Sequence, residues 1–151
     1  MRRWRLWTDD DAGSAALEFI LMGLVLLVPV VYLVVTLGLI QGQTMGVEAG
    51  ARHIARAVSL APDIETARAR AHEVLRDVVD EYGLDAKGVE VTFRCRPKGV
   101  ACPSAGATLV VTVRTSVGLP LVPPVLGLDR LARVDVEASA AQRMSRYWGA
   151  G

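Results

Sequence analysis

The feature that most restricts the fold of this chain is a stretch near its start that lacks ionisable residues. From Phe19 to Val47 the sequence contains no Asp, Glu, Lys, Arg or His. An α-helix over 19–40, the most apolar part, would be about 33 Å long at a rise of about 1.5 Å per residue, enough to cross a hydrocarbon core of about 30 Å. Because the run is apolar on every side, we expect a transmembrane helix rather than a core helix of a soluble domain.

Basic residues predict the orientation of this helix. Three arginines stand at positions 2, 3 and 5, whereas the first basic residue after the run is Arg52. Since basic residues that flank a membrane segment tend to stay in the cytoplasm, we expect residues 1–13 to be a cytoplasmic leader. The bulk of the chain would then lie outside the cytoplasmic membrane, as a single-pass protein.

A cleaved secretory signal peptide fits the sequence poorly. Such a peptide has an apolar core of about 7–15 residues, followed by the small residues of its cleavage site. Here the apolar run is longer, and the small residues Gly13 and Ser14 precede it.

The helix is predicted to continue beyond the membrane. Apolar residues recur at helical spacing up to Pro62, which ends the pattern: Val47, Ala51, Ile54, Ala55 and Val58. We therefore expect one long helix over about 14–60, with its first half in lipid and its second half amphipathic.

Glycine recurs every fourth residue along this helix, at Gly38, Gly42, Gly46 and Gly50. Such a stripe forms a groove that lets another backbone approach closely. Three explanations remain open: contact with another molecule, packing against the chain's own domain, or a high glycine content without a structural role.

Residues 61–147 are predicted to form an α+β domain outside the membrane. A second helix is expected between Pro62–Asp63 and Gly83, because proline and aspartate suit a helix start and glycine suits a helix end. The period of the apolar residues then changes from the helical spacing to two, which predicts a small antiparallel sheet of about three strands. The expected strands are Val89–Cys95, Ala107–Val117 and Arg130–Met144, the last with Leu131, Val134 and Val136 facing inward; residues 148–151 are expected to be a loose tail.

Cys95 and Cys102 are the only cysteines. A domain outside the membrane lies in an oxidising compartment, so we expect a structural disulfide between them. Two free thiols, or a metal pair, are the alternatives, although metal sites usually combine tighter cysteine spacing with further ligands.

No motif in the sequence indicates catalysis. His53 and His72 stand alone on their helices, and there is no glycine-rich phosphate loop, nucleophile elbow or His-Glu-x-x-His motif. A net charge of +1 without a basic run gives no reason to expect a nucleic-acid partner. The charges at 68–70 and 73–77 look like scattered surface pairs of little energetic weight. We therefore expect no enzyme activity, cofactor, metal or small-molecule substrate.

The stretch G-S-A-A-L-E-F, from Gly13 to Phe19, resembles the processing site of type IV prepilins. The resemblance is strongest to the TadE-like minor pilins or pseudopilins of the Flp/Tad pilus. It implies a pilin-like fold, cleavage after Gly13 by a prepilin peptidase, and Ser14 as the new N-terminus. Glu18 would then be residue five of the mature chain and Phe19 residue six, and the partners would be other pilins and the Tad assembly platform.

A charge pair with the new N-terminus would explain why a carboxylate stands at position 18. A carboxylate in apolar surroundings is costly unless it meets a cation, and cleavage would create an amino group about 6 Å away along the helix, at Ser14. A simpler explanation is that an acidic residue is favourable in the first turn of any helix. The alternative to a pilus function is an uncleaved, signal-anchored envelope protein whose outer domain binds a partner, and a weaker third option is a membrane-tethered enzyme.

Overall fold

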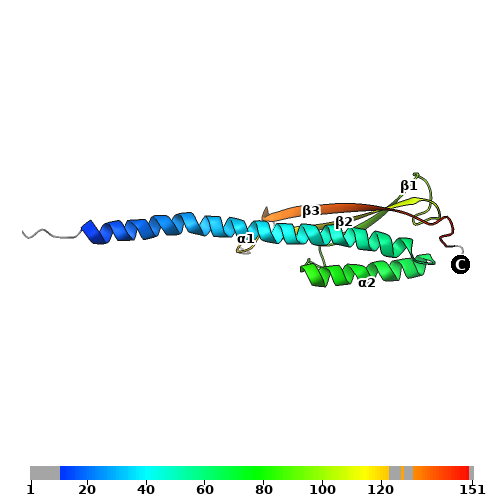
Figure 1. Cartoon of the computed structure of the whole chain (residues 1–151), viewed down its shortest axis with the longest axis horizontal. Coiled ribbons are helices and arrows are strands. Elements are labelled where there is room, and N and C mark those ends of the chain that lie inside the picture. Colours follow the sequence, from blue (N-terminus) through cyan, green and yellow to red (C-terminus); the bar gives the residue numbers. More distant parts are fainter. Residues whose placement is uncertain (1–10, 123–126, 128–130, 150–151) are drawn as a thin grey trace, which may run out of the picture. The chain divides into compact units, whose positions relative to one another are not determined.

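The computed structural model describes residues 11–122, 127 and 131–149, and the side chains from residue 14 onward. It contains two α-helices and one antiparallel sheet, so the predicted α+β class is confirmed (Figure 1). The arginines of the leader and most of the connection between the last two strands lie outside the described residues. In chain order, the elements are α1 (Asp11–Ser59), α2 (Ile64–Tyr82), β1 (Glu90–Arg96), β2 (Thr108–Gly118) and β3 (Arg133–Arg143).

The chain divides into an N-terminal unit, Met1–Leu37, and a C-terminal unit, Gly38–Gly151. The described part of the N-terminal unit is entirely helical, and almost all of its side chains from Ser14 onward are exposed. Pro29 lies within α1 without interrupting it. The 18-residue apolar window within Ser14–Ser59 has no buried residue, and in the described part of the chain this is the single helix long and apolar enough to cross a membrane.

The core of the C-terminal unit is built on the part of α1 that belongs to it. The five apolar residues predicted to share one face of this helix are each at most 2% exposed, so that prediction is confirmed. They join a single apolar cluster with residues of α2 and of the sheet, including Leu109, Val111 and Val113 of β2. Burying an apolar side chain of this size contributes about 1.5–3 kcal/mol, so each of these residues stabilises the unit substantially.

Both ends of α2 are set by the residues that the sequence indicated. The carboxylate of Asp63 accepts hydrogen bonds from the backbone N–H of Thr66 at 2.7 Å and from its hydroxyl at 2.9 Å. These bonds, the backbone one first, lower the pKa of Asp63 below its usual value, because they favour the charged form. Gly83 ends the helix in the left-handed conformation, with φ of 61°, and its N–H donates to the carbonyl oxygen of Val79.

The sheet has the order β1-β2-β3, and both neighbouring pairs are antiparallel. Alternate residues of β2 are buried against the helices, as the period of two predicted. The opposite face is polar: Arg114 pairs with Glu137, and the hydroxyls of Thr112 and Ser139 are 2.8 Å apart. One face of the sheet therefore belongs to the core and the other faces solvent.

The inward-facing residues of β3 were predicted only in part. Val136 is 7% exposed, as expected, but Leu131 is 81% exposed and Val134 is 37% exposed. Leu131 is exposed because the strand begins only at Arg133, so this residue precedes the alternating pattern. Val134 lies on the same face of the sheet as Val136, but it is near the end of the strand, opposite Val117.

The expected loose tail is wrong for Trp148, the first residue of that segment. Its side chain is partly buried against the core, and its indole Nε1–H donates to the carbonyl oxygen of Val58 at 3.2 Å. Val58 lies in the last turn of α1, and its carbonyl oxygen accepts both this bond and one from the backbone N–H of Ala61 at 3.3 Å. An indole packed on apolar residues satisfies its N–H in this way.

Leu109 and Leu131 provide a matched test of the core, because the first is buried and the second is exposed. We expect Leu109→Ala to lower the free energy of unfolding by about 2–5 kcal/mol, because Leu109 is fully buried and its truncation leaves a cavity. Leu131→Ala should change it by less than about 0.5 kcal/mol, because that side chain faces solvent. The measurement is urea unfolding in lipid nanodiscs, followed by the fluorescence of Trp148 in a Trp4→Phe, Trp7→Phe background. Equal effects of the two substitutions would contradict the assignment.

Candidate functional site

The residues of the proposed processing motif all lie in the first turns of α1. Ser14, Glu18 and Phe19 are exposed, whereas the surroundings of Gly13 lie outside the described side chains. No basic group in the described part of the chain lies within ion-pair distance of Glu18. An ionised carboxylate is costly in lipid unless a cation neutralises it. Within a membrane, the cation for Glu18 would therefore have to come from outside the described residues.

The four glycines of the stripe in α1 have two different environments. A methyl group on Gly46 would lie 2.6 Å from Cγ of Tyr82, and one on Gly50 would lie 3.2 Å from a methyl of Val78. Both glycines therefore serve the close packing of α2 on α1 within the C-terminal unit. Gly38 and Gly42 have nothing within 4 Å of the equivalent position in the described structure. Packing against the chain's own domain accounts for half of the stripe.

The difference within the stripe can be tested with alanine. Gly46→Ala should destabilise the C-terminal unit by about 1–2 kcal/mol, because overpacking against Tyr82 outweighs the gain in helix propensity. Gly42→Ala should raise the free energy of unfolding by up to about 1 kcal/mol, because only the propensity gain remains. Urea unfolding in nanodiscs measures both, and a loss of stability in Gly42→Ala would show that this position has an undetected contact.

Cys95 and Cys102 form a disulfide in the C-terminal unit, with their Cα atoms 5.4 Å apart. Cys95 is near the end of β1, and Cys102 lies in the loop that leads towards β2. The bridge closes a short loop, so its contribution by loop entropy is modest, on the order of 2–3 kcal/mol. Its more specific effect is to fix the loop carrying Cys102 and Pro103 against the end of β1.

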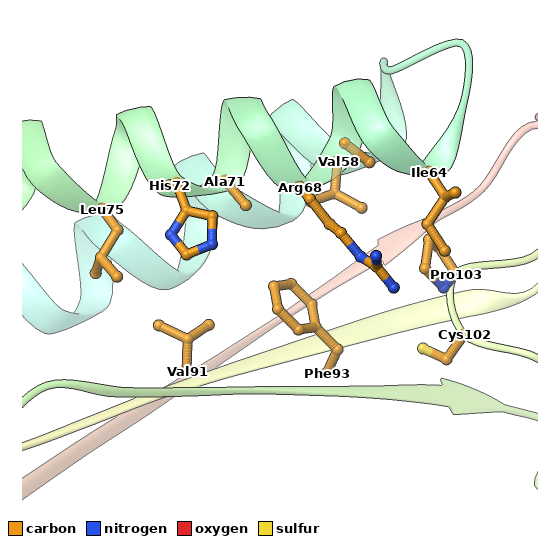
Figure 2. A pocket seen from close by; sticks show the side chains of 11 residues that line it. Val58, Ile64, Arg68, Ala71, His72, Leu75, Val91, Phe93, Cys102 and Pro103 are labelled. Carbon is orange, nitrogen blue, oxygen red and sulfur yellow. The ribbon is translucent and has the colours of Figure 1, made fainter.

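A cavity of about 220 Å³ lies beside this disulfide, between α2 and β1 (Figure 2). Its lining is mainly apolar and comes from α1, α2, β1 and the disulfide loop. Figure 2 shows Val91 and Phe93 on the β1 side and Ala71 and Leu75 on the α2 side. Phe93 is 39% exposed, which shows that the cavity is open rather than sealed in the core.

Two nitrogen-bearing side chains, Arg68 and His72, interrupt this apolar lining. They are one helical turn apart on α2, and in Figure 2 both point from the helix towards β1. Neither makes an ion pair or a side-chain hydrogen bond within the described residues. The expected charge pairs between residues 68–70 and 73–77 are thus not found for Arg68.

The sequence patterns do not predict this cavity. Arg68 and His72 are both exposed, in agreement with the surface positions predicted for them, but both also lie next to the apolar stripe of the second helix and line the cavity. A usable signal was present: the pair at 68 and 72 has the same spacing as the buried Ala67 and Ala71, one residue further on. Such an offset places two polar groups at the border of an apolar face.

The described residues contain no group of three or more His, Cys, Asp or Glu side chains that could hold a metal ion. His53 is exposed on α1, and His72 borders the cavity without a carboxylate partner.

Comparison of the chain with family models, with curated proteins and with solved structures finds no match.

Proposed function

We propose that this chain is a TadE-like minor pilin or pseudopilin that is processed after Gly13 and takes part in assembling a Flp/Tad-type pilus. The observation that carries the proposal is the position of G-S-A-A-L-E-F directly before the apolar length of α1. In this reading the chain is inserted in the cytoplasmic membrane with its N-terminus inside and its C-terminal unit outside. Its partners are the prepilin peptidase, other pilins and the platform proteins of the pilus machinery.

The order of cleavage site and apolar helix supports a pilin over a secreted protein. A cut after Gly13 removes only the leader and leaves the membrane anchor attached to the C-terminal unit. It also creates an α-amino group about one helical turn before Glu18. The carboxylate of Glu18 can be neutralised by this group, in the same chain or in a neighbour, and entry into a bundle of helices then depends on that charge pair.

The cut itself is the first test. N-terminal sequencing of the protein from its native membrane should find Ser14 at the start of the mature chain. Gly13→Val should block the cut, because the side chain would occupy the site of cleavage. Gly23→Ala is the matched control: it lies within the apolar run, a Cβ there has nothing within 4 Å, and the cut should be unchanged. A mature chain that begins at Met1 would instead favour an uncleaved, signal-anchored protein that binds an envelope partner.

The role of Glu18 is tested separately. Glu18→Ala should leave membrane insertion and the cut intact but abolish most pili, because the new amino group loses its carboxylate. Glu48→Ala is the matched control, since Glu48 lies on the same helix but is half-exposed and pairs with Arg52 at 3.5 Å. Electron microscopy of the two strains counts the pili, and normal pilus numbers in Glu18→Ala would rule out the charge pair.

A further inference from the structure

We propose that the cavity between α2 and β1 binds a small organic acid, with its apolar body in the cavity and its carboxylate held by Arg68 and His72. The proposal is independent of the pilus function, because it depends only on residues within the C-terminal unit. It also adds a ligand class that the sequence pattern did not indicate.

The size of the cavity limits the apolar body of the ligand. Its volume of about 220 Å³ exceeds that of an engineered cavity of about 150 Å³ that binds benzene. It is below the range of about 300–1,000 Å³ typical of sites for drug-sized molecules. An apolar body of one aromatic ring or a short branched chain therefore fits within this volume.

The charges around the cavity favour an anion. None of its lining residues is acidic, and two of them, Arg68 and His72, carry nitrogen donors. The disulfide loop beside the cavity, residues 97–103, contains Lys98 and no Asp or Glu, whereas Arg94 and Arg96 alternate with Phe93 along β1 and so lie on the opposite face of the sheet. A ligand carboxylate would therefore find nitrogen donors and no negative charge among the lining residues.

The geometry of the two donors suits a carboxylate. A guanidinium group binds both oxygens of a carboxylate in a fork, and a neutral imidazole supplies one further N–H. Because residues four apart on a helix are neighbours, Arg68 and His72 can reach the same group. Figure 2 shows the ring of His72 above Val91 and the side chain of Arg68 extending past Phe93 towards Cys102 and Pro103. Both donors are free within the described residues, so binding need not break an existing ion pair.

The experiment uses the full-length protein in lipid nanodiscs, so that no detergent competes for the cavity. The probe is phenylacetate, and the reference is phenylacetamide, which has nearly the same shape without the charge. Methyl NMR should show saturable shifts at Ile64, Leu75 and Val91, which line the cavity, and none at Val117, which does not. The acid should bind about tenfold more tightly than the amide, since a bond to a charged group adds at least that factor.

Substitutions on α2 separate the charge from the cavity. Arg68→Gln should remove the preference for the acid while amide binding persists, and His72→Gln should reduce that preference in part. Arg76→Gln is the matched control, because Arg76 is an exposed arginine of the same helix outside the cavity, and it should leave the preference unchanged. The proposal is overturned if phenylacetate causes no saturable shift, if acid and amide bind equally, or if the preference survives in Arg68→Gln. Shifts confined to methyl groups of the apolar run would show partition into lipid and would also overturn it.

Discussion

The packing of one face of α1 against the sheet is the interaction on which the C-terminal unit depends. Val47, Ile54 and Val58 are almost fully buried, and each faces a cluster that includes the centre of β2. Neither a three-stranded sheet nor a single amphipathic helix can bury its apolar face alone. Because α1 supplies the missing face, the C-terminal unit is built on the second half of the same helix that carries the apolar run, and residues 47–58 of α1 are part of its core.

Small residues decide how the second helix joins this core. Gly46 and Gly50 allow Tyr82 and Val78 of α2 to approach the backbone of α1, which side chains at these positions would prevent. The same kind of stripe serves helix contacts in membranes, and here half of it is used within one chain. The glycines that remain open, Gly38 and Gly42, begin the C-terminal unit and are the part of the stripe still available to a neighbouring molecule.

Local patterns in the sequence predicted the helices and strands of the fold. The predictions that were wrong or missing concern features that depend on contacts between residues far apart in the sequence. The buried face of α1, the caps of α2 and the alternation of β2 are each encoded in a few consecutive residues, so periodicity and capping residues were sufficient. The exposure of Leu131 depends on where β3 begins, and strand ends are set by pairing with β2. Trp148 is anchored by a carbonyl group 90 residues earlier in the chain, which no local pattern could indicate. The cavity was missed for the same reason, because its walls come from segments between Val58 and Pro103.

The two halves of α2 explain why a cavity forms where it does. The C-terminal half, with Val78 and Tyr82, is drawn against the glycines of α1. The N-terminal half presents the small residues Ala67 and Ala71 to the core, so it fills the space above β1 incompletely. The disulfide joins the loop that carries Cys102 and Pro103, which line this space, to the end of β1. The cavity bordered by Arg68 and His72 therefore lies where α2 carries small side chains, and not at its closely packed C-terminal end. Substitutions that fill the cavity can leave the contact between α1 and the C-terminal end of α2 intact.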